Sequence, residues 1–188
     1  SSKISVIYNA SRFSRQPKKQ QQPLILWIGS ISNRKNLKNL LEAYILFRNQ
    51  VKNPPDLILS GRFYNEKNSL LKPYTEAIKK GHIRYVGRLK DEELSALLQQ
   101  ASFLVNPSYY EGFGLPLVEA MACGLPIACS DIEAFKEVCA DAAIYFSPNS
   151  VESIAEAMTL LWNNPDLRNK LSINGLAQQA KFTWYESA

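Results

Sequence analysis

Short, largely apolar runs alternate along this chain with stretches in which apolar residues recur every three or four positions. The runs fall at 3–8, 24–28, 57–59, 83–86, 103–105, 126–128 and 143–146. Runs of this length without polar alternation are typical of strands buried on both faces. The helical spacing predicts helices near 37–47, 67–80, 91–100, 116–123, 133–138, 150–163 and 165–180, with Asp91 as the N-cap of the third. Strands alternating with helices predict a Rossmann-like three-layer α/β sandwich around a parallel sheet of about six strands.

The length of 188 residues predicts one domain, 1–188. Within it, residues 11–23 are polar, proline-containing and without periodicity, which predicts a surface linker. Its basic residues Arg12, Arg15, Lys18 and Lys19 are interpreted as solvated; the alternative is peripheral contact with anionic membrane lipid. Because the chain begins with Ser1 and a strand pattern follows at once, we expect it to be part of a longer protein.

Charge and cysteine content narrow the function. Residues 1–50 carry nine basic residues and one acidic residue, whereas 131–188 carry four and eight, within a net charge of +5. This asymmetry indicates a localised anion site rather than a uniformly basic surface. No apolar run approaches the length of a membrane span. The three cysteines lack CxxC spacing and His82 is the only histidine, so we expect no metal site and a reducing, cytoplasmic location.

The segment around 107–126 holds the most informative motif. Gly112 and Gly114 permit tight backbone conformations, and Pro116 suits the first turn of a helix. Free N–H groups at such a helix start bind phosphate or diphosphate. Glu111 and Glu119 flank the loop, where each carboxylate could reach sugar or ribose hydroxyls. This motif alone leaves open the alternative that the glycines only turn the chain and Glu119 is solvated.

Two further loops follow predicted strands, and the carboxyl ends of parallel strands share one edge of the sheet. The planar guanidinium of Arg34 and the ammonium group of Lys35, a point charge, could both bind phosphate. Taken alone they could be solvated loop cations, but their position beside a second anion-binding loop favours phosphate binding. The backbone groups of residues 85–90 could bind the edge of a nucleotide base. The alternative is that this segment is an ordinary strand-to-helix turn.

These residues also carry a resemblance to a known family. The patterns GxxxxxKN from Gly29, VGRL from Val86, PSYYEGFGLPLVEAMACGLPIACSD from Pro107, EV…DAAIYFSP and KFTW resemble the C-terminal, donor-binding domain of GT-B glycosyltransferases of family 4, or group 1. The resemblance runs from about residue 3 to 184. It implies a retaining enzyme that transfers a hexose, mannose or glucose, from a GDP- or UDP-sugar to a glycan or lipid-linked acceptor. It also implies that no cofactor or metal is required.

The same resemblance assigns roles to individual residues. Glu111 would touch the donor sugar as the catalytic residue, Glu119 would bind the ribose hydroxyls, and the sugar would also contact the backbone of the glycine loop. The implied site consists of diphosphate-binding Arg34, Lys35, Gly114 and Leu115, sugar-binding Glu111, Gly112 and Phe113, and ribose- or base-binding Arg88, Leu89 and Glu119.

The sequence departs from the family pattern in two places. Many members have Arg where this chain has Ser30; either Arg34 takes that role or one phosphate contact is missing. The family's N-terminal acceptor-binding domain, with its histidine near the reacting carbon, has no counterpart here, so we expect it as a partner in cis. His82 is interpreted as a surface or strand-cap residue.

Two other function classes compete with this hypothesis. A non-catalytic nucleotide- or nucleic-acid-binding module is the alternative, but RNA-binding faces interleave exposed aromatic and basic residues. Here Tyr109 and Tyr110 are followed by Glu111, so we expect no nucleic-acid partner. A dinucleotide oxidoreductase would show GxGxxG after its first strand, and this chain does not.

Overall fold

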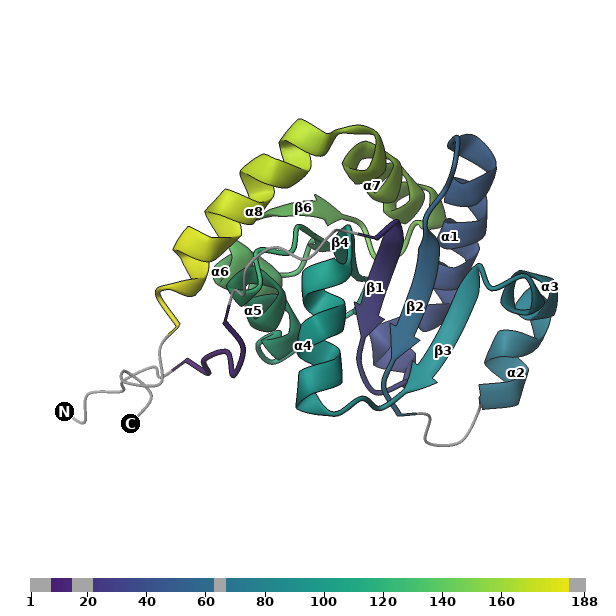
Figure 1. The fold of residues 1–188 in the computed structure, drawn as a ribbon, viewed down its shortest axis with the longest axis horizontal. Coiled ribbons are helices and arrows are strands. Elements are labelled where there is room, and N and C mark those ends of the chain that lie inside the picture. Colours follow the sequence, from purple (N-terminus) through teal and green to yellow (C-terminus); the bar gives the residue numbers. More distant parts are fainter. Residues whose placement is uncertain (1–7, 15–21, 63–66, 183–188) are drawn as a thin grey trace.

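A computed structural model describes residues 8–14, 22–62 and 67–182. Its six strands form one parallel sheet in the order β3-β2-β1-β4-β5-β6, which confirms the predicted three-layer α/β architecture (Figure 1). The strand expected at 3–8 lies outside the described residues except for Tyr8, as do Arg15, Lys18, Lys19 and the Trp184 end of the KFTW motif.

The elements follow the expected alternation. The strands are β1 (Leu24–Ile28), β2 (Asp56–Ser60), β3 (Ile83–Gly87), β4 (Phe103–Asn106), β5 (Ile127–Ser130) and β6 (Ala143–Phe146). The α-helices are α1 (Leu37–Gln50), α2 (Lys67–Leu71), α3 (Thr75–Lys79), α4 (Asp91–Gln100), α5 (Leu115–Ala122), α6 (Glu133–Cys139), α7 (Val151–Asn163) and α8 (Pro165–Gln179). Two 3₁₀ turns, η1 (Asn33–Lys35) and η2 (Lys72–Tyr74), complete the described chain.

Two helix boundaries differ from the prediction. The single helix expected at 67–80 is divided into α2, η2 and α3, because Pro73 lacks the N–H that would continue the ladder of hydrogen bonds. Asp91 is the first residue of α4 rather than its N-cap. Lys90 takes the cap position, and its backbone N–H donates to the Glu93 carboxylate at 2.9 Å.

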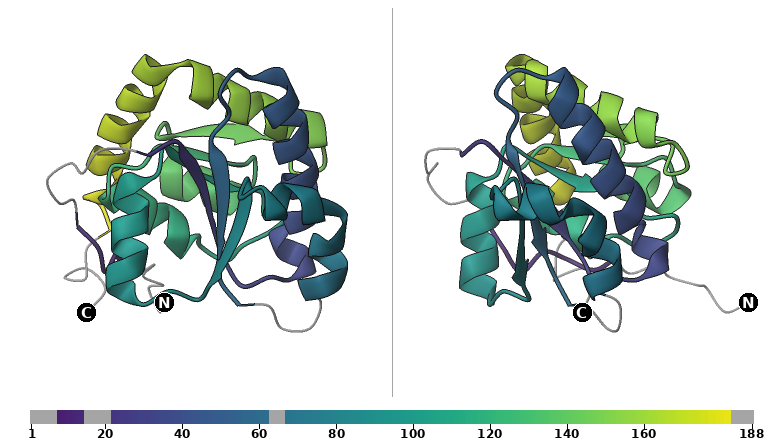
Figure 2. Two further views of the ribbon diagram at one scale, coloured as in Figure 1. Left: turned by 45° about the vertical axis from the view of Figure 1, so that its right-hand side comes forward. Right: turned by 90° about the vertical axis from the view of Figure 1, so that its right-hand side faces the viewer.

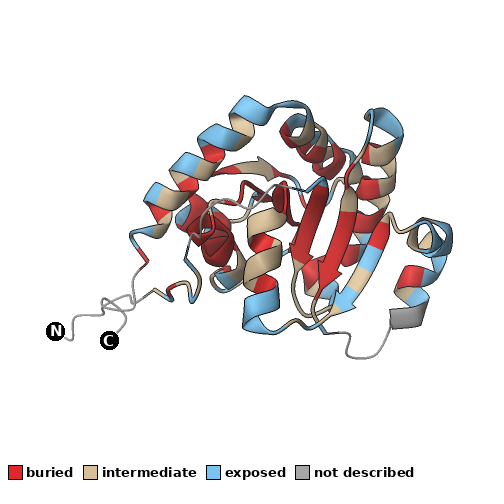
Figure 3. Ribbon diagram, in the orientation of Figure 1, coloured by how far each residue is buried: buried red, intermediate tan, exposed pale blue. Residues whose placement is uncertain are grey.

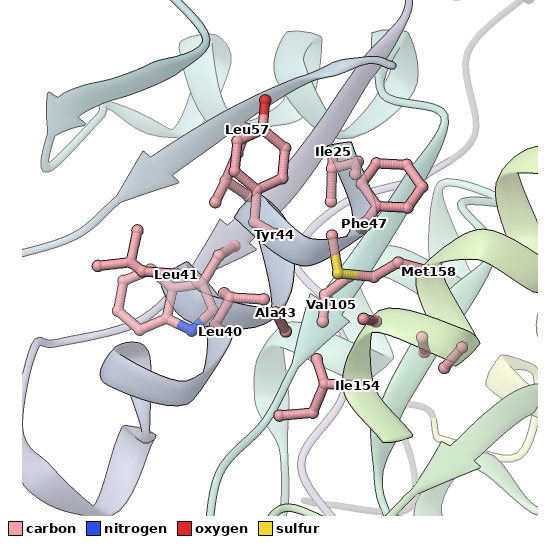
Figure 4. Packing of buried hydrophobic residues seen from close by; sticks show 14 of the residues in the cluster. Ile25, Leu40, Leu41, Ala43, Tyr44, Phe47, Leu57, Val105, Ile154 and Met158 are labelled. Carbon is pink, nitrogen blue, oxygen red and sulfur yellow. The ribbon is translucent and has the colours of Figure 1, made fainter. Parts of the chain in front are cut away.

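Both faces of the sheet are covered at its centre, which explains why β1 and β4 are almost entirely apolar. On one face, Ile25 and Trp27 of β1 pack under α1 and α7. On the other, Leu24 and Leu26 pack under α4, α5 and α6. Figure 2 shows the sheet between these two layers, and Figure 3 shows that most of the central strands is buried. In Figure 4, Phe47 of α1 and Met158 of α7 lie in the same apolar layer.

The carboxyl ends of the strands meet along one rim. The backbone N–H of Gly29 after β1 donates to Ser60 O at 3.0 Å, and that of Gly61 after β2 donates to Gly87 O at 2.8 Å. Gly61 has φ +151°, and a Cβ built on it would lie 1.6 Å from Gly29 O. The loops after β1 and β2 therefore touch backbone to backbone at a position where only glycine fits.

We predict that Gly61→Ala destabilises the domain more than Gly81→Ala. Gly81 has φ +77°, and a Cβ added to it would meet nothing within 4 Å, so its substitution adds only backbone strain, about 1–2 kcal/mol. Gly61→Ala adds the clash with Gly29 O, about 1–3 kcal/mol more. Urea unfolding of both variants measures the difference. Equal losses would contradict the close approach of the two loops.

Candidate functional site

The loop after β1 is fixed to the loops after β4 and β6 by one buried side chain. Asn36 has φ 53°, in the left-handed region, and is 3% exposed. Its side-chain amide donates to Pro107 O at 3.1 Å and to Pro148 O at 2.7 Å. The backbone N–H of Tyr109 donates to Arg34 O at 2.8 Å. These bonds hold the segment of Arg34 and Lys35 against the segment that contains Glu111.

Glu111 is the centre of a buried charge cluster. Lys35 Nζ lies 2.5 Å from Glu111 Oε1, and Arg34 pairs with Oε2. The side chains of Lys35 and Glu111 are only 8% and 9% exposed. The Ser108 hydroxyl also donates to Oε1, at 2.8 Å. The interpretation of Lys35 as a solvated cation is therefore wrong.

The protonation of Glu111 follows from these partners. Burial by itself raises the pKa of the carboxyl, but the hydrogen bond and charge of Lys35, with the hydrogen bonds from Ser108 and Arg34, outweigh it. The pKa of Glu111 consequently lies below its ordinary value. With two cations around one carboxylate, the cluster keeps an excess positive charge of one, which suits an anionic ligand.

The start of α5 lies between the two carboxylates in the sequence. Gly114 precedes the helix with φ +115°, and its carbonyl accepts from the backbone amides of Leu117 and Val118. Pro116 has no N–H to donate. Across the described ranges, no acceptor is paired with the amides of Gly114 and Leu115, so both are available to an anion at the helix start.

Gly112 is exposed, but the Phe113 ring belongs to an aromatic group rather than to an open loop. Its centroid lies 6.0 Å from that of Tyr8 and 5.8 Å from that of Phe182. The side chain thus fixes the glycine loop to the two ends of the described chain.

Glu119 is buried and not solvated, contrary to the simpler alternative. Its side chain is 3% exposed, and Arg12 Nε lies 2.9 Å from Oε1. Burial raises the pKa of Glu119, and the charge of Arg12 offsets only part of that effect. The same guanidinium pairs with Asp91 at 2.9 Å. The interpretation of Arg12 as a solvated linker residue is therefore wrong, because it is paired with two carboxylates. No local pattern could have identified it, since Glu119 is 107 residues away.

A cleft of about 260 Å³ opens beside Arg12, at the same rim. Its walls come from the ends of β1, β2 and β3 and from the start of α4. The lining residues are Arg12, Ile28, Gly29, Ser30, Ser60, Gly61, Arg62, Arg88, Leu89, Asp91 and Leu94. The cleft thus contains Arg88 and Leu89, two of the residues for which the resemblance implies a base or ribose contact. Arg62, which the sequence analysis did not identify, also lines the cleft, and its backbone carbonyl accepts from the N–H of Ile31, next to Ser30.

His82 lies at the amino end of β3, so it is at the opposite rim from the site. Its Nδ1 is 3.4 Å from Asp56 Oδ1, at the start of β2.

Cys123, Cys129 and Cys139 are buried and free. Within 8–14, 22–62 and 67–182, no group of three or more acidic, His or Cys side chains is placed to hold a metal ion. In the same ranges no helix combines the length and apolar character needed to cross a bilayer.

Comparison with known proteins identifies the family. The sequence model described as "Glycosyl transferases group 1" matches residues 10–178. The chain is 38% identical over 163 residues to O-antigen chain mannosyltransferase B of Escherichia coli, covering 87% of this chain and 43% of that protein. It is 30% identical over 167 residues to O-antigen chain mannosyltransferase RfbU of Salmonella typhimurium, covering 88% and 46%. The chain thus spans less than half the length of these relatives.

Solved structures share the fold. The chain superposes on WaaG, described as a glycosyltransferase involved in lipopolysaccharide biosynthesis, with a TM-score of 0.71 at 23% identity, over 87% of this chain and 44% of WaaG. It superposes on sucrose-phosphate synthase from Thermosynechococcus elongatus with a TM-score of 0.70 at 24% identity, over 90% and 43%.

We predict that Lys35 and Glu111 are strongly coupled in stability. Glu111→Gln leaves the buried Lys35 ammonium without its carboxylate and should lower the free energy of unfolding by about 3–5 kcal/mol. Lys35→Met should cost less, because Arg34 and Ser108 still bind Glu111. The double variant should lose much less than the sum, because it removes both charges. Urea unfolding of the four proteins measures the coupling, and additive losses would contradict the buried pair.

The pH dependence of stability provides a second readout of the same pair. The folded pKa of Glu111 lies below 4.5, its ordinary value. Its contribution should therefore be complete above that pH and lost as the pH falls through the lower, folded value. The stability gap between the wild type and Glu111→Gln should be constant from about pH 5 to 7 and narrow in more acidic solution. A gap that narrows toward higher pH would contradict this assignment.

Proposed function

The chain belongs to the glycosyl transferases group 1 family, and we propose that it is the nucleotide-sugar-binding domain of a retaining glycosyltransferase. The proposed reaction transfers a hexose, with mannose first, from a GDP- or UDP-sugar to a glycan or lipid-linked acceptor. The observation that carries this proposal is the buried cluster of Lys35, Arg34 and Glu111 beside the start of α5.

The cluster supports diphosphate binding by its charge and its position. A diphosphate placed there would meet Lys35 and Arg34 and the free amides of Gly114 and Leu115. Charge-assisted hydrogen bonds of this kind contribute about 1.5–3 kcal/mol each. We propose that these groups balance the charge of the leaving diphosphate, so that the reaction requires neither a metal nor a cofactor.

The nucleoside and the sugar would lie on either side of the diphosphate. On the side of α4, the cleft with Arg88 and Leu89 is the proposed base site, and Glu119 is the proposed acceptor for the ribose hydroxyls. On the other side, Glu111 and the backbone of Gly112 and Phe113 would contact the sugar. Glu111 is the proposed catalytic residue.

The relatives support the choice of mannose and of a glycan acceptor, since the two compared above are named O-antigen chain mannosyltransferases. Because the chain spans under half of their length, the acceptor site is proposed to lie in an N-terminal domain in cis. The proposed compartment is the cytoplasm, at the inner face of the membrane when the acceptor is lipid-linked. The buried, unpaired cysteines suit its reducing conditions.

We predict that Lys35→Ala and Glu119→Ala each weaken binding of GDP or UDP about 10- to 100-fold, since each removes an interaction of about 1.5–3 kcal/mol. Calorimetry at several salt concentrations separates their roles. Lys35→Ala should flatten the salt dependence, because it removes a phosphate contact. Glu119→Ala should mainly reduce the preference for ribonucleotides over 2′-deoxyribonucleotides.

Lys38→Ala is the matched control for this prediction. Lys38 lies three residues beyond Lys35, its side chain is 74% exposed, and its nearest carboxylate oxygen, in Glu42, is 4.0 Å away. Its removal should leave nucleotide affinity unchanged within about twofold. Unchanged affinity in both site variants would overturn the donor-site assignment.

We predict that this chain alone binds the nucleotide sugar but transfers it to no acceptor. Positioning of the acceptor oxygen supplies about 7–11 kcal/mol in reactions of this kind, and it requires an opposing wall. A radiolabelled-donor assay on the purified chain should show slow hydrolysis at most. Restoring an N-terminal domain in cis should restore transfer. Acceptor-dependent transfer by the 188-residue chain that disappears in Glu111→Ala would show a complete active site here.

A further inference from the structure

Arg12 lies in the proposed nucleoside site and pairs with Glu119, the carboxylate that we propose binds the ribose. Its Nε is 2.9 Å from Glu119 Oε1 and its terminal nitrogen is 2.9 Å from Asp91 Oδ1. The Arg12 side chain is 45% exposed and lines the cleft, whereas that of Glu119 is 3% exposed. Arg12 therefore joins a buried carboxylate to the open part of the site.

We propose that Arg12 is a positioning residue for nucleotide binding, which holds Glu119 as an oriented carboxylate that accepts hydrogen bonds from the two vicinal hydroxyls of ribose. The inference rests on the proposed function, in which Glu119 binds ribose. A carboxylate has about four lone-pair sites, so one bond from Arg12 to Oε1 leaves Oε2 and part of Oε1 free for hydroxyl donors.

The guanidinium is held in place from several directions. Its central carbon lies 4.9 Å from the centroid of the neighbouring Phe13 ring, and Asp91 binds it from the start of α4. The segment that carries it is tied to α6 by the Tyr8 hydroxyl, which donates to Glu137 Oε1 at 2.6 Å. The Tyr8 ring packs against Phe113 and Phe182. Arg12 is thus positioned before any ligand binds.

Arg12 is also the group that favours the charged form of Glu119. Burial raises the pKa of Glu119, and the charge of Asp91 raises it further, while Arg12 acts in the opposite direction. The other titratable group beside it, Cys123 just past the end of the same helix, has a pKa of about 12 and stays neutral. Without Arg12, Glu119 would take up a proton at higher pH. A protonated carboxyl would lose part of its capacity to accept from ribose.

The test compares Arg12→Gln, which removes the charge, with Arg12→Lys, which keeps it. Calorimetry with GDP and with 2′,3′-dideoxy-GDP, from about pH 5 to 9, gives the preference for ribose at each pH. In Arg12→Gln this preference should fall about tenfold near neutral pH, as expected for losing one charge-assisted bond. The pH below which the preference is lost should also rise. Arg12→Lys should recover most of both properties.

Two further variants make the result specific. Arg84→Gln, on an exposed position of β3, removes the same charge outside the cleft and should leave the preference unchanged. Glu119→Gln should reduce the preference, and adding Arg12→Gln to it should reduce it no further, because both act on one carboxylate. A role in folding alone would not alter the ribose preference or its pH dependence.

The following results would overturn the inference about Arg12 or the proposed function beneath it. An Arg12→Gln protein with unchanged ribose preference and pH profile would show that Arg12 does not act through Glu119. Tighter GDP binding by Arg12→Gln would show that Arg12 instead occupies the ribose position and is displaced by ligand. Absence of GDP and UDP binding by the wild-type chain would overturn the proposed function itself, which distinguishes its failure from that of the Arg12 inference.

Discussion

The buried pairing of Lys35 with Glu111 is the interaction on which the site depends. Isolating either charge from water costs several kcal/mol unless a partner lies within contact distance. Lys35 follows β1 and Glu111 follows β4, and these strands are neighbours in the sheet, with Ile25 opposite Phe103. The chain crosses to opposite faces of the sheet after these two strands, since α1 covers one face and α5 the other. The pair thus spans the point at which parallel sheets of this order bind their ligands. Asn36, in its left-handed conformation, keeps the two loops in register for it.

The fold could be predicted from the sequence because both faces of the strands are buried. Leu26 and Trp27 point to opposite sides, yet each meets an apolar helix layer, so the strand pattern is continuous and short. The errors arose where local chemistry competed with periodicity. Pro73 interrupts the helical spacing at 67–80, and Glu93 reaches back to the Lys90 amide and moves the start of α4 by one residue. Such details depend on single hydrogen bonds that a hydrophobic pattern does not encode.

Only those residues of the candidate site that lie shortly after a strand could be predicted from the sequence. Lys35, Glu111, Gly114 and Arg88 each lie shortly after a strand, and the common direction of the strands brings them to one rim.

Arg12 and Arg62 were missed for different reasons. Arg12 lies in a segment without periodicity, and only the path of the folded chain places it on Glu119. Arg62 follows Gly61 directly, but its position beside Ser30 results from the backbone bond between Ile31 N and Arg62 O, at 2.8 Å.

The two carboxylates are both buried but differ in their partners, and this difference limits what each can do. Glu111 has a cation on each oxygen and a hydroxyl donor besides, so its pKa falls despite burial. Burial raises the pKa of Glu119, and its one cation, which it shares with Asp91, offsets only part of that effect. At neutral pH Glu111 is therefore an anion with no proton to give, and it cannot serve as a general acid toward a leaving group. Its remaining roles are electrostatic, toward positive charge that develops on a sugar, or orienting, toward sugar hydroxyls. The protonation of Glu119, in contrast, depends on the balance between burial, which raises its pKa, and Arg12 at the edge of the cleft, which lowers it. The proposed nucleoside end is therefore the part of the site that is sensitive to its surroundings.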